Sequence, residues 1–167
     1  MEPQDIITPS ADKLQRTRYY MGGYWTFLAT AADTNGQFSL IEANLRKGLE
    51  PPRHTHTHED ESFHVIEGEI VIAAGQEQYV LKTGDFLHIP KGVPHNFSLL
   101  TDKVKMLIHM VPAGLEQMFL ELSQPAVAID YPPLPAGSPS PELLQKIALL
   151  QQKYGITGME NNHIKSI

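Results

Sequence analysis

An all-β domain is the fold that this sequence predicts, and three observations support it. From Tyr24 to Met110 the chain consists of short apolar runs separated by turn signals. No window before residue 112 keeps the apolar period of about 3.6 residues that a helical domain requires. Helical patterns occur only after residue 112. Runs this short and this closely spaced are typical of a β-sandwich or barrel rather than of alternating βαβ units.

The expected strands follow one another with a turn signal at most junctions. Asn35-Gly36, Thr83-Gly84-Asp85 and Lys91-Gly92 are combinations that favour tight turns. The expected strands are the apolar runs 24–30, 38–45, 62–66, 69–74, 78–82, 86–90, 95–100 and 104–111.

The last third of the chain has a different character. Residues 113–122 place apolar side chains on one helical face, and residues 125–141 hold six prolines, which favour an extended connection. A second helix is predicted to begin at Ser140, its N-cap, with Pro141 in the first position, and to end at Gly155. Residues 158–167 are expected to fray. We therefore predict an N-terminal arm (1–23), a β-domain with a short closing helix (24–122), and a proline-rich linker with a C-terminal helix (123–167).

Composition limits the classes of function. The chain has 167 residues, no cysteine and a formal net charge of −6, and its lysines and arginines form no cluster. Nucleic-acid binding thus has little electrostatic support, and disulfides and cysteine-ligated metals are excluded. No apolar run approaches the length of a membrane span. The first residues lack a basic start followed by an apolar stretch, so we expect a cytoplasmic protein.

The histidine-rich stretch from Pro51 to Ser62, PPRHTHTHEDES, is the main functional signal. Alternate side chains of a strand share one face, so two histidines two residues apart can bind one metal ion, whereas a third is too far along. The spacing alone does not decide which two bind. Glu61 lies at an odd offset from His54 and His56, which requires a bend or bulge before it.

The spacing of these residues resembles the two sequence motifs of the cupin superfamily. Gly48, His54, His56, Glu61 and Gly68 match the first motif. Gly84, Pro90, Gly92 and His95 match most of the second motif; its last position, usually Asn, is Leu99 here. Outside the motifs the chain more loosely resembles small single-domain bacterial cupins of the quercetin 2,3-dioxygenase type.

The resemblance implies a jelly-roll β-barrel and a ligand set. His54, His56, Glu61 and His95 would bind one divalent ion, which is iron, manganese, nickel, cobalt, copper or zinc, and His58 would lie at the bend. Glu61 would also act as the catalytic base. Five apolar side chains are expected to line the substrate pocket, namely Phe63, Phe97, Leu99, Met106 and Ile108.

The same resemblance implies a metal-dependent oxidoreductase, a dioxygenase that acts on a flavonol-like or otherwise enolisable small molecule with dioxygen. The alternatives are another metal-dependent cupin enzyme, such as an isomerase, decarboxylase or lyase, and a non-catalytic small-ligand binding protein. Fold does not decide among them. Cupins of this kind commonly pair, so we expect a homodimer in which residues 1–23 reach a neighbour.

Overall fold

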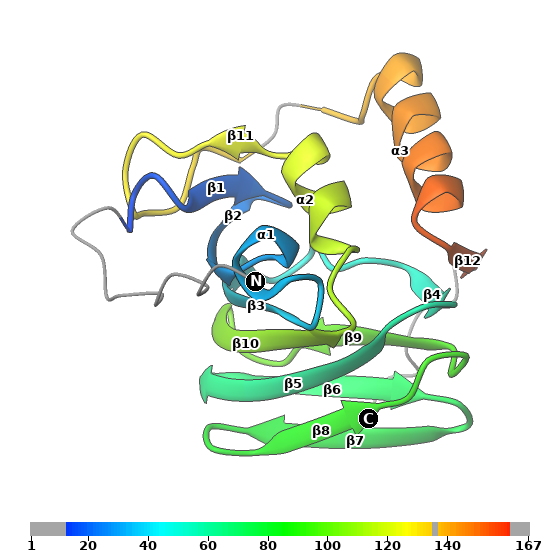
Figure 1. The fold of residues 1–167 in the computed structure, drawn as a ribbon. Helices are drawn as coiled ribbons and strands as arrows, with labels where there is room; N and C mark the ends of the chain where they lie inside the picture. The colour runs from blue at the N-terminus through cyan, green and yellow to red at the C-terminus, as the bar shows by residue number, and fades with distance from the viewer. Residues whose placement is uncertain (1–12, 135–136, 161–167) are drawn as a thin grey trace.

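The computed structural model describes residues 13–134 and 137–160 (Figure 1). Residues 1–12 of the expected N-terminal arm and residues 161–167 of the expected frayed end lie outside this range. The arrangement is an all-β jelly roll, as the sequence predicts, with two antiparallel sheets that are not closed into one barrel.

The larger sheet contains seven strands among the described residues. Their spatial order is β11 (Gln124–Pro125), β1 (Thr17–Tyr20), β2 (Gly23–Ala29), β3 (Ser39–Arg46), β10 (Lys103–Val111), β5 (Asp60–Glu67) and β8 (Phe86–Ile89). Consecutive strands often lie apart, because β10 inserts between β3 and β5 and contributes the longest pairing to each.

The smaller sheet contains five strands within the same described ranges. Their order is β12 (Ile156–Glu160), β4 (Arg53–His56), β9 (His95–Leu99), β6 (Glu69–Ala74) and β7 (Glu77–Lys82). In Figure 1, β5 and β8 of the larger sheet lie in front of β6 and β7. The first and last strands of this sheet come from distant parts of the chain.

The hydrophobic core lies between the two sheets. Along β10, Val104, Met106, Ile108 and Met110 are buried, while the residues between them are more exposed. This period of two is what a strand with one buried face requires. The strand expected from the apolar run 104–111 is thus confirmed as β10, with one face in the core.

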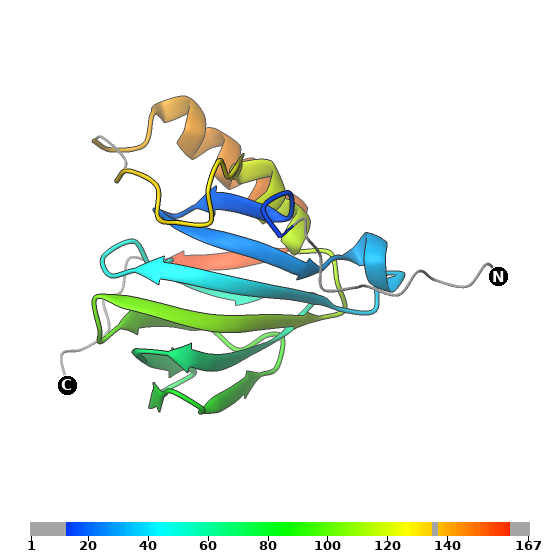
Figure 2. The same ribbon diagram turned by 90° about the vertical axis from the view of Figure 1, so that its left-hand side faces the viewer.

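Three helices lie outside the sandwich in the described chain: α1 (Ala31–Thr34), α2 (Glu116–Leu122) and α3 (Pro141–Lys153). The predicted helix 113–122 is confirmed as α2, and the predicted C-terminal helix as α3, whose N-cap Ser140 accepts a hydrogen bond from Leu143 N (3.2 Å). Figure 2 shows α2 and α3 gathered beside β1, at one end of the sheets. None of the helices in residues 13–134 and 137–160 has the length and apolar character needed to cross a bilayer.

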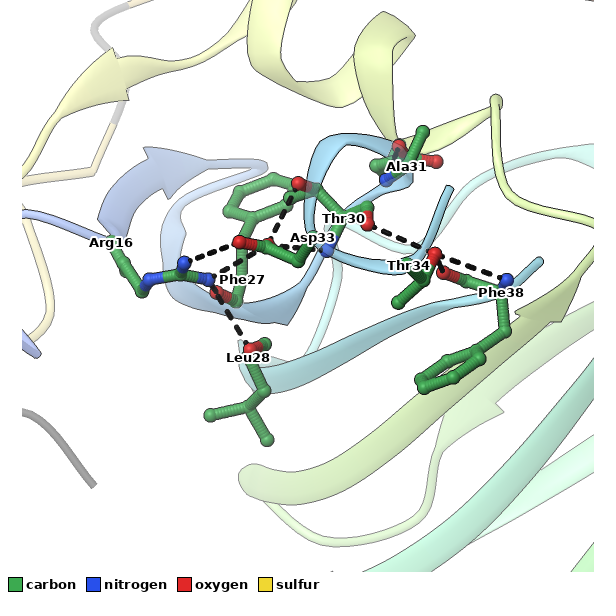
Figure 3. A network of polar contacts seen from close by, with 9 residues as sticks. Arg16, Phe27, Leu28, Thr30, Ala31, Asp33, Thr34 and Phe38 are labelled. Atoms are coloured by element: carbon green, nitrogen blue, oxygen red, sulfur yellow. Dashed lines mark hydrogen bonds and ion pairs between the residues drawn. The ribbon is translucent and has the colours of Figure 1, made fainter. Parts of the chain in front are cut away.

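An ion pair between Arg16 and Asp33 fixes α1 to the start of β1 (Figure 3). Arg16 donates to both carboxylate oxygens of Asp33, at 3.1 and 2.7 Å, and to the carbonyls of Phe27 and Leu28. Asp33 also accepts from the backbone N–H and hydroxyl of Thr30, both at 2.9 Å. One carboxylate thus joins the start of β1 to the turn between β2 and β3.

Candidate metal centre

Three strands bring four possible ligands together, as the motif spacing predicted. His54 and His56 lie on β4, and His95 lies on the neighbouring strand β9. Glu61 comes from β5, in the other sheet. One ligand atom from each of the four lies within 4.8 Å of the other three, so a single ion can reach all four.

The path of the chain explains how His56 and Glu61 can face the same site although an odd offset separates them in sequence. We expected one strand with a bend or bulge, but β4 ends at His56 and a separate strand, β5, begins at Asp60. Residues 57–59 carry the chain from one sheet to the other. Since the two strands belong to facing sheets, residues at an odd offset can point into the same interior. The exposed His58 lies within this connection.

The distances between ligand atoms suit a bound cation. His54 Nε2 lies 3.0 Å from His56 Nε2, and His95 Nε2 lies 2.9 Å from Glu61 Oε2. His56 Nε2 and Glu61 Oε2 are 3.8 Å apart. Ligands about 2.1 Å from one ion are about 3.0 Å from each other when they meet it at right angles. The spacings of 3.0 and 2.9 Å match this value, and the spacing of 3.8 Å corresponds to a wider angle at the ion.

Backbone carbonyls select the tautomer of two of the histidines. His54 Nδ1 lies 2.8 Å from Pro52 O, and His95 Nδ1 lies 2.9 Å from Val93 O. A carbonyl can only accept, so each Nδ1 carries a proton and Nε2 is the ring nitrogen that faces the cluster. In both cases the carbonyl belongs to the second residue before the histidine. This is the arrangement that orients imidazole ligands toward a metal.

The ring nitrogens of the histidines and the type of the four donor groups show whether these residues fit a divalent metal ion. His54 Nε2 lies 3.0 Å from a second imidazole nitrogen, His56 Nε2, so two possible ligand atoms already face each other. Within the described chain, the buried His56 Nδ1 has no hydrogen-bond partner. Three imidazoles and one carboxylate form a donor set that suits divalent transition metals and zinc. The residues present therefore fit the group that their spacing implies.

Burial and mutual charge set the ionisation of the cluster. Burial alone would raise the pKa of Glu61, but the charge of His56 and the hydrogen bond from His95 lower it to about 2. Burial, with the charges of His95 and His56, lowers the pKa of His54 to about 4, and burial also lowers that of His56. Burial works against the charged form of His95, yet contact with Glu61 raises its pKa. Glu61 is consequently an anion at neutral pH, beside two histidines that are held neutral.

The five apolar residues expected around a substrate are all buried, with exposed fractions of 5% or less, and belong to the hydrophobic core: Phe63, Phe97, Leu99, Met106 and Ile108. The Phe63 ring is 6.4 Å from the His95 ring and 5.9 Å from the Phe97 ring. Phe63 thus lies beside the cluster, and Phe97 lies beside Phe63. Substrate contact by any of the five stays a prediction.

Sequence reasoning missed the roles of two glutamates, Glu50 and Glu59. Glu50 accepts hydrogen bonds from Gly48 N (2.8 Å) and Leu99 N (2.9 Å), and so ties the chain before β4 to the end of β9. Glu59 is only 5% exposed, and burial raises its pKa. Neither could be found from the sequence, because both look like solvated charges until the tertiary fold covers them.

Fold and site together define the class of this protein. Residues 42–112 match the family model of the cupin domain, so the chain contains a cupin domain, as the motif spacing predicted. It is similar to quercetin 2,3-dioxygenase from Bacillus subtilis (strain 168), with 29% identity over 126 residues, covering 75% of this chain. The enzyme of the same name from Aspergillus japonicus is 27% identical over 126 residues and 70% of this chain. The chain spans 37% and 35% of the lengths of these two relatives.

Solved structures support the fold. KdgF from Halomonas sp. superposes with a TM-score of 0.52 and 17% identity, covering 57% of this chain and 85% of that one. Oxalate decarboxylase from Bacillus subtilis gives a TM-score of 0.50 and 20% identity, covering 59% of this chain and 27% of that one. At these identities the likeness establishes the jelly roll alone.

Proposed function

We propose that this protein is a metal-dependent cupin oxidoreductase, a dioxygenase that acts on a flavonol-like or otherwise enolisable small molecule. The observation that carries the proposal is the convergence of His54, His56, Glu61 and His95 within 4.8 Å of one another. Similarity to two quercetin 2,3-dioxygenases supports the reaction type. Because the chain spans little more than a third of their length, the activity is a proposal for this chain.

The four residues would hold one divalent ion per chain, of iron, manganese, nickel, cobalt, copper or zinc. When bound, such an ion would act as a Lewis acid that favours the ionised form of a substrate hydroxyl group. His54 and His95 are already oriented for this by Pro52 O and Val93 O. Little rearrangement is therefore needed on binding.

Glu61 is proposed as ligand and general base together. With a pKa of about 2 it is ionised throughout the neutral range, so it is always ready to accept a proton. A carboxylate can take a proton from an acidic enolic hydroxyl more readily than from a simple alcohol, so an enolic substrate suits this site better. The proton leaves the substrate oxygen and resides on the Glu61 carboxylate.

Phe63 and Phe97 are proposed to keep the reacting region dry, with Leu99, Met106 and Ile108 behind them. An apolar wall matches a flat, largely apolar substrate and keeps water from competing for its anion. Dioxygen is the second substrate. Both of its atoms enter the organic products, so the reaction needs no external reductant.

Oxygen uptake by metal-reconstituted protein, measured with a panel of flavonols and other enolisable compounds, tests the proposal. His95→Ala is expected to lose both metal and turnover. Glu61→Gln is expected to retain metal but lose turnover by roughly 10²–10⁴-fold. Full activity of Glu61→Gln would remove its role as base. Metal binding without oxygen uptake would favour another cupin reaction, and ligand binding without turnover would favour a binding protein.

A cytoplasmic homodimer completes the proposal, and residues 1–23 are its expected contact. Size-exclusion chromatography with light scattering tests the pairing. A monomeric mass would rule out the homodimer while leaving the metal centre unaffected.

A further inference from the structure

The strand that carries His54 and His56 takes one of its two neighbours from the end of the chain. β12 pairs with β4 in antiparallel fashion, with Ile156 opposite His56 and Thr157 opposite Thr55. On its other side, β4 pairs with β9 through His54 and His95. Figure 1 shows β12 following α3 and lying beside β4, although about one hundred residues of sequence separate them. The position of the two histidines therefore depends on a segment outside the cupin motifs.

The contact between the end of the chain and the β4 segment is closest at Thr57, immediately after His56. The backbone N–H and the hydroxyl of Thr57 both donate to Gly155 O, at 3.0 and 2.8 Å. Gly155 has a φ of +70°, and a Cβ built there would collide with Thr57 Oγ1 and lie 2.6 Å from the His58 ring. Any larger residue here would adopt a strained φ and would force the Thr57 hydroxyl and the His58 ring to move.

The segment that bears Gly155 is itself anchored. Glu121 of α2 accepts from Lys153 Nζ (2.8 Å) and from the Tyr154 hydroxyl (2.6 Å), and its carbonyl accepts from Lys146 Nζ (2.6 Å). Leu150 and Ile156 are buried against the core. Residues 141–160, which we call the C-terminal unit, are thus fixed at one end to α2 and at the other to β4.

We propose that the C-terminal unit positions His54 and His56 for the metal ion, with Thr57 and Gly155 as the positioning residues. Docking of this unit and occupancy of the metal site then stabilise each other, because a coupling between two binding events acts equally in both directions. The inference rests on the metal site of the proposed function but not on its reaction.

Gly155→Ala, with Gly158→Ala as its matched control, tests the inference by cobalt(II) titration of the full chain. Both glycines have a left-handed φ (+70° and +67°), so both variants carry the same backbone strain. A Cβ at position 158 meets only Thr55 Oγ1, at an ordinary 3.7 Å. We expect Gly155→Ala to raise the cobalt Kd by about tenfold or more and to change the cobalt absorption bands. Gly158→Ala should keep the wild-type bands.

Thr57→Val and Thr57→Ser provide a second test if Gly155→Ala does not fold. Valine keeps the shape but loses the hydroxyl that donates to Gly155 O, whereas serine keeps the donor. Valine should weaken cobalt binding, and serine should restore it. Wild-type affinity and bands in Thr57→Val, or in Gly155→Ala, would overturn the inference while leaving the metal site intact.

Hydrogen exchange on the wild-type chain gives the reciprocal measurement. Cobalt should slow exchange of the amides of β12, although β12 supplies no ligand. Slower exchange confined to the three ligand strands would overturn the coupling. Wild-type protein that bound no cobalt would instead overturn the metal site, and with it this inference, so the two failures are distinguishable.

Discussion

Asp33 shows how much one carboxylate can organise in this protein. It accepts from the guanidinium of Arg16, from the backbone N–H of Thr30 and from the Thr30 hydroxyl. The hydrogen bond from Arg16 is the main reason why the pKa of Asp33 falls from its ordinary 3.8 to about 2. A carboxyl group with a lower pKa in the folded than in the unfolded chain stabilises the fold only while it is ionised.

Asp33→Asn is expected to lower the free energy of unfolding by about 1 kcal/mol at pH 6, a modest value because Arg16 is partly exposed. The stabilisation is fully present above about pH 4 and is lost as the pH falls toward 2. Urea unfolding of both proteins across this range should show the difference closing. If the difference in the free energy of unfolding stayed constant down to pH 2, the lost stability would come from the altered shape of the side chain rather than from its lost charge.

The four clustered residues could be predicted because their spacing is a local property of the sequence. Their surroundings could not. The carbonyls of Pro52 and Val93 orient two of the imidazoles, but the sequence does not record where a carbonyl points. The burial of Glu59 depends on how the segment before α2 closes over the connection between β4 and β5, which is a tertiary contact. The sequence thus predicted the possible ligands but not the groups that hold them.

Among the elements, α2 and α3 were predictable, whereas α1 and β12 were not. The cap at Ser140 and the proline at the first helical position are local signals, and the helix that they predicted is confirmed. Residues 158–160 were expected to fray, yet they belong to β12. The sequence from Ile156 to Glu160 lacks a regular alternation of apolar side chains, because its strand conformation comes from pairing with β4. Only the fold reveals that partner.

Leu150→Ala, compared with its neighbour Leu149→Ala, measures how α3 is held. Leu150 is 7% exposed and Leu149 is 60% exposed. Loss of the buried side chain should cost about 2–3 kcal/mol, whereas loss of the exposed one should change stability by less than about 0.5 kcal/mol. Hydrogen exchange should show faster opening of α3 and β12 in Leu150→Ala. Equal behaviour of the two variants would mean that the contacts of Glu121, rather than Leu150, dock the helix.

For the molecule as a whole, the sequence predicted the all-β class, because its apolar runs are short and closely spaced and are separated by turn signals. It did not predict that the sheets stay open, or that the C-terminal unit joins the smaller one. Those outcomes depend on contacts between residues far apart in sequence. The domain boundaries at residues 23 and 122, and the homodimer, stay predictions.

Metal should stabilise the entire molecule, because its proposed ligands come from both sheets. A free metal concentration of about one hundred times the Kd adds about 2.7 kcal/mol, which for a domain of this size raises the Tm by roughly 5–10 °C. Thermal unfolding with and without chelator measures the shift. His95→Ala should abolish it. A shift of equal size in that variant would place the stabilising ion elsewhere.

The division of the ligands between the sheets also has a consequence for biosynthesis. β4 and β9 supply the histidines from one sheet, whereas β5 supplies Glu61 from the other. A nascent chain that ends at Glu61 already contains His54, His56 and Glu61. It still lacks His95 and the strand β9 that carries it. The full donor set appears only when His95 has left the ribosome and the two sheets have packed together. Selection among competing cellular metals would therefore fall to the folded domain rather than to the nascent histidine-rich segment.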